Sequence, residues 1–250
     1  MRSWRLDMRA AALWQTTIRV IYPPTCLCCD ARVQEDGALC GACWRDTPFI
    51  SGPVCDGCGA PLMGEVVGGD LCDDCLTLHR PWAQGRAALV YDGNGRRLVL
   101  ALKHGDQMHL ARPAGRWMAR AARAMELDNA VVAAVPLHWR RMVKRRYNQS
   151  VLLARQVARD AGLELCPDLL IRRIATPSLG GLGSDARYRL MARTLAVRSS
   201  RLPLIRDRPI LLIDDVMTSG ATLSVATEAL IAAGSGPVRV LTLARAVKEA

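Results

Sequence analysis

Paired cysteines give this sequence its clearest chemical signal. Eight of its ten cysteines form four Cys-x-x-Cys pairs: Cys26 and Cys29, Cys40 and Cys43, Cys55 and Cys58, Cys72 and Cys75. Four thiolates bind one structural zinc ion as a tetrahedron, and two intervening residues allow the tight turn that presents both sulfurs of a pair. The sequence therefore predicts two structural Zn²⁺ ions and leaves Cys28 and Cys166 outside the ligand set.

The spacing leaves the pairing of these cysteines open. Joining consecutive pairs gives two tandem ribbons, and an interleaved arrangement fits as well. Disulfides and an iron–sulfur cluster are alternatives to zinc. The first fifteen residues, MRSWRLDMRAAALWQ, lack the apolar stretch and small-residue cleavage site of a signal peptide. We therefore expect a cytoplasmic, reducing location, where disulfides are rare, and a folding role for zinc in so small a module.

A second chemical signal lies near the carboxyl end. Residues 209–222, PILLIDDVMTSGAT, place two carboxylates after an apolar run and follow them with a turn of small and hydroxyl residues. The helical pattern from Leu223 to Ala233 puts this turn at a helix N-terminus, where backbone N–H groups bind phosphate. Asp214 and Asp215 would repel a phosphate, but they can accept hydrogen bonds from a ribose diol. A simple strand-end and capping role is the alternative.

The elements that would position this turn alternate in type after Pro81. Residues 130–135 form an apolar run that predicts a buried strand ending at Pro136, and residues 148–162 follow with helical spacing and a terminal glycine. Residues 169–171 and 194–197 predict two further strands. This alternation indicates an α/β domain.

Charge and composition narrow the class of protein. The 250 residues carry a net charge of +11, and only three of the 34 basic residues are lysines. Arginine binds phosphate in a bidentate manner, so this balance favours nucleic acid or a phosphorylated small molecule, with gene base composition as the alternative. No apolar run reaches the roughly 18 residues of a membrane span.

The sequence also contains cations and histidines outside these two motifs. Five cations follow the predicted strand at 130–135, and their position favours phosphate contact over a solvated face: Arg140, Arg141, Lys144, Arg145 and Arg146. Lys103 and His104 fit a solvated helix end. His109 and His138 are isolated, so neither is assigned to a metal.

The segment 209–222 resembles the phosphoribosyl pyrophosphate (PRPP) motif of type I phosphoribosyltransferases. Three shorter motifs accompany it: VPL at 135–137, RRYNQ at 145–149 and RRIATPS at 172–178. Together with the four cysteine pairs they resemble the ComF/GntX family of double-zinc-ribbon, phosphoribosyltransferase-like proteins from about Tyr22 onward.

The resemblance implies a doubly wound parallel sheet behind an N-terminal cysteine-rich double zinc ribbon. We place a helical segment at 1–22, the double ribbon at 23–80 and the phosphoribosyltransferase-like domain at 85–250. The family also implies Mg²⁺ on the diphosphate if the protein is catalytic, and a link to the uptake of transforming DNA, with single-stranded DNA and a DNA-uptake helicase as possible partners.

Site residues follow from the same resemblance. Those expected to bind PRPP are Asp214, Asp215, Thr218, Ser219, Gly220, Ala221 and Thr222. Those expected at the pyrophosphate or in a flap over 176–192 are Pro136, Leu137, Arg145, Arg146 and Arg187.

Two functional classes remain open. One is a phosphoribosyltransferase that displaces pyrophosphate from PRPP with a nitrogen nucleophile. The other is a DNA- or nucleotide-binding accessory protein without turnover. Leu179 and Leu190 stand where the family commonly has Gln and Asn, which favours the second class slightly.

Overall fold

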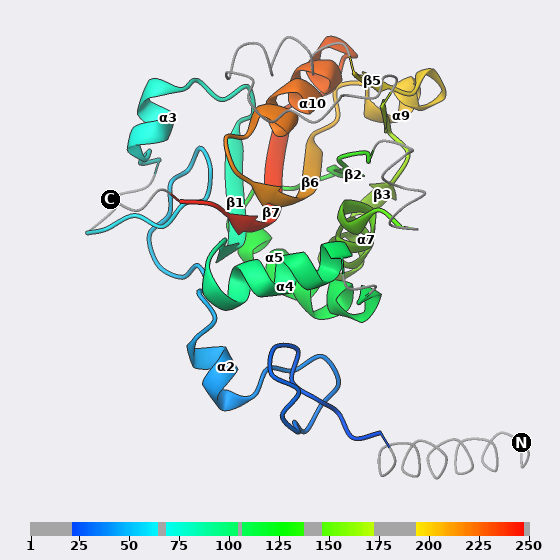
Figure 1. Cartoon of the computed structure of the whole chain (residues 1–250). Coiled ribbons are helices and arrows are strands. Elements are labelled where there is room, and N and C mark those ends of the chain that lie inside the picture. Colours follow the sequence, from blue (N-terminus) through cyan, green and yellow to red (C-terminus); the bar gives the residue numbers. More distant parts are fainter. Residues whose placement is uncertain (1–21, 65–68, 105–106, 138–146, 173–193, 248–250) are drawn as a thin grey trace, which may run out of the picture. The chain divides into compact units, whose positions relative to one another are not determined.

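The computed structural model describes residues 22–64, 69–104, 107–137, 147–172 and 194–247 (Figure 1). The chain divides into two compact units, Met1–Thr47 and Pro48–Ala250. Except for Tyr22, the predicted helical segment at 1–22 lies outside the described residues. Among the residues that are described, no helix has the length and apolar character needed to cross a membrane.

The described part of the smaller unit consists mainly of turns and the short helix α2 (Gly41–Arg45). The Cys40 sulfur caps this helix by accepting a hydrogen bond from the Cys43 N–H group. No residue of α2 is buried. The local structure therefore depends on turns and cysteines more than on an apolar core.

The larger unit is built on a five-stranded parallel sheet with the order β1-β7-β6-β2-β3. Its strands are β1 (Gln84–Val90), β2 (Val131–Ala134), β3 (Glu164–Cys166), β6 (Ile210–Met217) and β7 (Val238–Arg245). Every residue of β2 and the first four of β6 are buried. Continuous burial of this kind is typical of parallel strands covered on both faces.

Helices cover both faces of the sheet. α5 (Ala111–Ala121) and α7 (Gln149–Ala161) pack side by side, whereas α10 (Ala221–Ala232) lies away from them (Figure 1). Leu223, Ala226 and Leu230 of α10 share an apolar core with Ile210 and Leu212 of β6. Side chains alternate along a strand, so the fully buried Leu211 and Ile213 face the opposite layer. The predicted doubly wound parallel sheet is confirmed.

Shorter elements complete the unit. They are α3 (Asp73–Thr77), α4 (Gly93–His104), α9 (Leu202–Ile205), three 3₁₀ turns (Met108–Leu110, Ala122–Ala124 and Ser199–Arg201) and an antiparallel pair, β4 (Leu170–Arg172) and β5 (Leu195–Val197). The strands and helix expected at 130–135, 148–162, 169–171 and 194–197 are present as β2, α7, β4 and β5. The sequence analysis did not predict β1, β3 or β7, nor the pairing of β4 with β5.

The strand order creates a topological switch point at the carboxyl edge of the sheet. β2 and β6 are neighbours, and the chain leaves β2 through α7 toward β3 but leaves β6 through α10 toward β7. The two connections diverge to opposite sides. In doubly wound sheets such a switch point is where ligands bind.

Candidate functional site

The paired aspartates lie at this switch point. β6 continues past Asp214 and Asp215 to Met217, so both acids belong to the last part of the strand. Their neighbours in the sheet are β7 on one side and β2 on the other. The Val135 N–H group donates to the Ile213 carbonyl at 3.0 Å, which ties the end of β2 to the residue before the acids.

Asp214 is held by the beginning of α7. Its Oδ1 atom accepts hydrogen bonds from the Ser150 hydroxyl at 2.9 Å and from the Asp215 N–H group at 2.8 Å. Burial, and then the charge of Asp215, raise the pKa of Asp214 to about 7. This carboxyl group can therefore exchange a proton near neutral pH when a ligand changes its surroundings.

Asp215 pairs with a cation that the sequence assigned differently. The Lys103 Nζ atom lies 2.9 Å from Asp215 Oδ1, so the expectation that Lys103 is a solvated helix end is wrong. The end of α4 is held toward α7 because the Tyr147 hydroxyl donates to the Leu102 carbonyl at 2.8 Å. Lys103 therefore supplies a positive charge beside the two carboxylates.

We call the residues from Thr218 to Thr222 the phosphate loop; they comprise the turn after β6 and the first two residues of α10. Thr218 and Ser219 are exposed, and α10 begins at Ala221, two residues before the start predicted from the sequence. Gly220 has a φ of 84°, in the left-handed region, and a Cβ there would lie 2.7 Å from Arg80 Nη1. Only glycine fits this position without strain. The Ala221 N–H group donates to the Ser219 hydroxyl at 3.4 Å, and the next N–H groups of the first turn of α10 can meet an anion.

A second helix begins at the same edge of the sheet. The Asn148 side chain caps α7 by accepting from the Ser150 N–H group at 3.0 Å, and it donates to the Val135 carbonyl at 3.1 Å. Pro136 and Leu137 follow, half-buried, at the end of β2. The N-termini of α7 and α10 therefore both contribute positive dipole ends near the two aspartates.

Several predicted site residues lie outside the described part of the chain. They are Arg140, Arg141, Lys144, Arg145, Arg146, Arg187 and the predicted flap at 176–192 with Leu179 and Leu190. Their roles stay predictions.

The eight paired cysteines form two clusters by consecutive pairing. The sulfurs of Cys26, Cys29, Cys40 and Cys43 lie within 4.8 Å of one another, as do those of Cys55, Cys58, Cys72 and Cys75. Across each cluster two sulfurs approach to 3.6 Å, close to the roughly 3.8 Å edge of a zinc–thiolate tetrahedron. The donor sets therefore fit one Zn²⁺ each.

Backbone groups also support metal binding. The Cys40 N–H group points at the Cys26 sulfur at 3.3 Å, and the Cys72 N–H group points at the Cys55 sulfur at the same distance. Such contacts stabilise the negative charge of metal-bound thiolates.

The second cluster is packed into the larger unit. Cys55, Cys58 and Cys75 belong to the same apolar core as α10, and the Trp82 indole N–H group donates to the Gly57 carbonyl at 2.6 Å. A Cβ on Gly85 of β1 would lie 2.6 Å from that carbonyl. The cluster therefore lies directly against the edge strand of the sheet.

Comparisons with known proteins agree with these observations. Residues 17–76 match the double zinc ribbon domain family, and residues 148–249 match the phosphoribosyl transferase domain family. Competence protein F of Haemophilus influenzae is 29% identical over 216 residues, which cover 83% of this chain and 90% of that protein. DNA utilization protein YhgH of Escherichia coli K12 is 26% identical over 213 residues, covering 83% and 90%.

Among solved structures, a glutamine PRPP amidotransferase from B. subtilis aligns with a TM-score of 0.36 and 21% identity, over 52% of this chain and 25% of that one. The cysteine clusters and the parallel sheet agree with the two family models. The chain joins a double zinc ribbon to a phosphoribosyltransferase domain, and over most of its length it is similar to proteins of the ComF family.

Proposed function

We propose that this protein binds PRPP, or a related ribose 5-phosphate ligand, at the carboxyl edge of its sheet. The observation that carries the proposal is the convergence of paired carboxylates and a helix N-terminus at the switch point between β2 and β6. Each part suits a different portion of the ligand.

The phosphate loop suits the 5′-phosphate. The exposed hydroxyls of Thr218 and Ser219 and the backbone N–H groups at the start of α10 can all donate to phosphate oxygens. The glycine at position 220 allows the left-handed backbone of this turn and its close packing against Arg80 and Trp82.

The two aspartates suit the ribose. Neither would attract a phosphate, but ionised carboxylates accept hydrogen bonds from a vicinal diol. Lys103 limits their repulsion of the diphosphate and can itself contact it after leaving Asp215. Mg²⁺ belongs to the same proposal, because a divalent cation neutralises diphosphate oxygens.

Calorimetric titration of the full, zinc-loaded chain tests this proposal. PRPP, with and without Mg²⁺, should bind more tightly than inorganic phosphate or 2-deoxyribose 5-phosphate. Substituting Asp214→Asn together with Asp215→Asn should weaken PRPP at least tenfold, because each lost hydrogen bond to a charged group costs about 1.5–3 kcal/mol.

A matched control removes two negative charges elsewhere. Glu126 and Asp128 are exposed and precede β2, at the opposite edge of the sheet, so Glu126→Gln with Asp128→Asn should leave the affinity unchanged. Equal binding of PRPP by the aspartate variant and the parent would show that the site is assigned wrongly.

The affinity for PRPP should rise with pH. A diol that donates to ionised Asp214 favours the charged carboxylate, so binding lowers a pKa that is about 7 in the free protein. Binding should release a proton below pH 7 and strengthen up to about that pH. Titration in buffers of different ionisation enthalpy measures this proton, and Asp214→Asn separates it from ionisation of the ligand's own phosphates.

Turnover is a separate question. Assay of pyrophosphate release with candidate nitrogen bases distinguishes a phosphoribosyltransferase from a protein that only binds the ligand. Tight binding without release would favour the accessory class that Leu179 and Leu190 suggest.

A second candidate function is binding of single-stranded DNA, and an arginine stripe on α5 favours it. Arg112, Arg116, Arg120 and Arg123 are exposed and recur at helical spacing, so they lie on one face of α5 and the turn after it. Successive members lie about 5–6 Å apart along the helix axis, near the spacing of phosphates in an extended strand. Two curated relatives carry names that refer to competence or DNA utilization.

Salt-dependent gel shifts test this second function. Arg116→Gln with Arg120→Gln should weaken binding of single strands and reduce the slope of log K against log salt by about 0.7 per lost contact. Arg155→Gln with Arg206→Gln, two exposed arginines off the stripe, is the matched control. Identical slopes in both variants and the parent would remove the stripe from consideration.

A further inference from the structure

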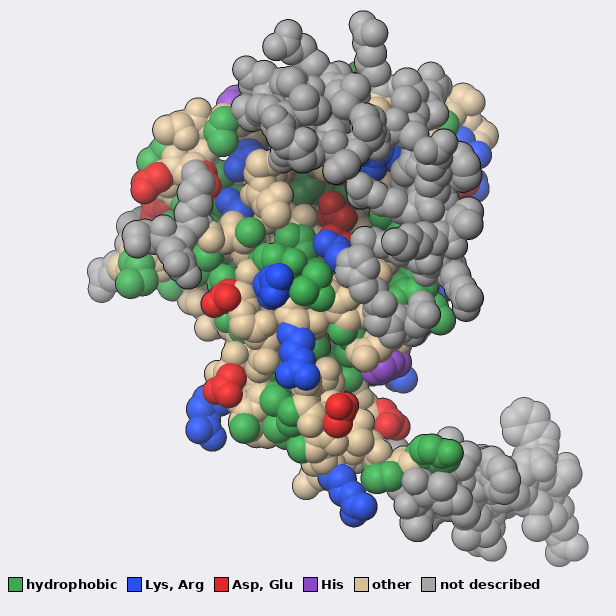
Figure 2. Space-filling model, in the orientation of Figure 1, with side chains coloured by type: hydrophobic (Ala, Val, Ile, Leu, Met, Phe, Trp, Pro, Cys, Tyr) green, Lys and Arg blue, Asp and Glu red, His purple; other side chains and the backbone are tan. Residues whose placement is uncertain are grey.

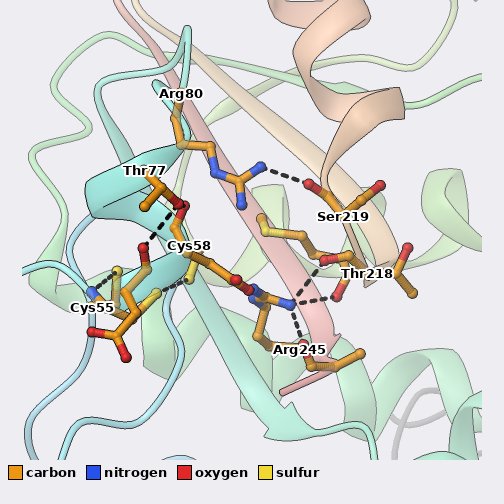
Figure 3. A network of polar contacts seen from close by, with 12 residues as sticks. Cys55, Cys58, Thr77, Arg80, Thr218, Ser219 and Arg245 are labelled. Carbon is orange, nitrogen blue, oxygen red and sulfur yellow. Dashed lines mark hydrogen bonds and ion pairs between the residues drawn. The ribbon is translucent and has the colours of Figure 1, made fainter. Parts of the chain in front are cut away.

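Two arginines lie between the second cysteine cluster and the phosphate loop (Figure 3). Arg80 follows α3, the helix that carries Cys75, and its Nη1 atom donates to the Ser219 carbonyl at 2.6 Å. Arg245 is the last residue of β7, and its Nη1 atom donates to the Thr218 carbonyl at 2.9 Å. Two successive carbonyls of the loop are therefore held from the side of the cysteines.

The same arginines reach the cysteine cluster. Arg245 Nη2 lies 3.7 Å from Asp74 Oδ2, in the helix that presents Cys75. Arg80 comes five residues after Cys75, directly beyond the same helix. Each arginine therefore connects the segment that presents Cys75 to one carbonyl of the phosphate loop.

Charge explains why arginines occupy these positions. A Zn²⁺ ion with four thiolates carries a net charge of about −2. Cys55 and Cys58 are 0% exposed, so that charge would lie in a medium of low polarity and require nearby cations. Arg245 is itself only 3% exposed. The positive charge of a guanidinium buried between Asp74 and a zinc–thiolate cluster is balanced by negative charge on both sides. Beside four neutral thiols, the same guanidinium would lose much of this balancing charge.

Peptide geometry connects these contacts to ligand binding. In a trans peptide the C=O and N–H bonds point in opposite directions. Holding the Thr218 and Ser219 carbonyls toward the arginines therefore directs the N–H groups of Ser219 and Gly220 away from them, where they can meet an anion. Gly220 also packs against Arg80 and Trp82, since a Cβ there would lie 2.7 Å from Arg80 Nη1 and 3.1 Å from the Trp82 ring.

We propose that Arg80 and Arg245 are positioning residues through which the second cysteine cluster, when it holds zinc, orients the phosphate loop for its ligand. The proposal rests on the proposed binding of PRPP. Loss of metal frees α3, which moves Asp74 and Arg80 together, and the loop carbonyls lose their donors. The first cluster supplies neither arginine.

The first test compares affinities in the zinc-loaded full chain. Arg80→Gln should weaken PRPP about tenfold while the protein keeps two zinc ions and its melting temperature. Arg206→Gln, an exposed arginine before β6, is the control and should change nothing. Arg245 is buried and its replacement can unfold the protein, so Asp74→Asn serves as the milder second variant, with a smaller loss of affinity.

The second test uses the reciprocity of linked equilibria: a metal that favours PRPP must itself be retained better when PRPP is bound. Release of zinc to a coloured chelator should show two phases, and PRPP should slow one of them. Cys40→Ser, which removes the first site, identifies the slowed phase as the second cluster. In Arg80→Gln the protection by PRPP should disappear.

These outcomes separate the two proposals. If the parent protein does not bind PRPP, the proposed function and this inference both fail. If it binds PRPP but Arg80→Gln binds equally well, or PRPP leaves both release phases unchanged, the coupling alone is overturned.

Discussion

Each of the two cysteine clusters offers four thiolate ligands, but the surroundings of the two clusters differ. In the first, Cys29 is exposed, Cys40 and Cys43 are half-buried, and the adjoining helix α2 buries nothing. In the second, Cys55 and Cys58 are fully buried in the core that also contains α10. The same motif therefore serves as the core of a small unit in one case and as part of a large core in the other.

Glycines account for much of this difference. Gly59 has a φ of 72°, and a Cβ on it would lie 2.7 Å from the backbone of Arg86 and Ala87, so the second ribbon packs closely on β1. Gly41, in the first ribbon, has open space around its missing Cβ. Backbone approach against the sheet, and not cysteine spacing, distinguishes the two ribbons.

The two clusters should differ most in how much of the chain unfolds when one cysteine ligand is removed from each. Cys58→Ser should abolish cooperative folding of the larger unit, because it leaves an incomplete thiolate set in a buried core and forfeits much of the roughly 10 kcal/mol or more of zinc binding. Cys40→Ser should unfold only the residues up to about 47. Thermal melting followed by circular dichroism, with elemental zinc analysis, measures both. Similar melting curves for the two variants would contradict the contrast.

Two glycine substitutions, one in each ribbon, test this contrast between the ribbons more closely. Gly59→Ala should destabilise the larger unit by about 2–4 kcal/mol, because the new methyl group meets backbone atoms and the positive φ becomes strained. Gly41→Ala, at the first position of α2, should be neutral or stabilise by up to about 1 kcal/mol. Denaturant unfolding gives both values. A loss below 1 kcal/mol for Gly59→Ala would mean that the ribbon can move away from β1.

A polar contact of the second ribbon contributes a smaller part of the free energy of unfolding, and this contribution depends on pH. Asp56 accepts hydrogen bonds from Gln84 Nε2 at 2.8 Å and Arg86 Nη2 at 2.6 Å. Burial would raise its pKa, but these two donors outweigh burial and lower it. A carboxyl group whose pKa is lowered by folding stabilises the protein at pH values above the unfolded pKa of 3.8. That contribution is lost as the pH falls below 3.8 and through the still lower folded-state pKa.

Asp56→Asn should therefore cost about 1–2 kcal/mol at pH 7, and this cost should shrink only as the pH falls below about 4. Denaturant unfolding at several pH values measures the difference between parent and variant, and Asp36→Asn, an exposed acid of the smaller unit, is the control. A cost that stays constant at pH values well below about 4 would assign the loss to shape and not to charge.

The sequence predicted those parts of the molecule that local pattern determines. The aspartates, the loop with Gly220 and the helix after it follow from an apolar run, two acids and a turn of small residues. All three are present, with α10 beginning two residues earlier than predicted. The consecutive pairing of cysteines was one of two options that spacing allowed, and only the three-dimensional proximity of the sulfurs selected it.

Long-range contacts were not predictable in the same way. Lys103 looks like any charged helix end until α7 brings the end of α4 beside Asp215. Arg80 and Arg245 lie 138 and 27 residues from Thr218 along the chain, and no local pattern relates them. One signal was available for Arg245. It closes the largely apolar strand VRVLTLAR at 238–245, so it lies at the same edge of the sheet as Asp214.

The smallest effects should come from the two cysteines outside the clusters, Cys28 and Cys166. The Cys28 N–H group points at the Cys26 sulfur at 3.4 Å, so its backbone and not its thiol contributes to the first cluster. Burial, and then the charge of Asp168, raise the pKa of the Cys166 thiol in β3, which keeps it protonated and unsuited to zinc. Cys28→Ala and Cys166→Ala should each cost about 1 kcal/mol or less, the loss of one buried sulfur. Elemental analysis should still find two zinc ions per chain in both variants, whereas one zinc in either would place that cysteine among the ligands and reopen the consecutive pairing.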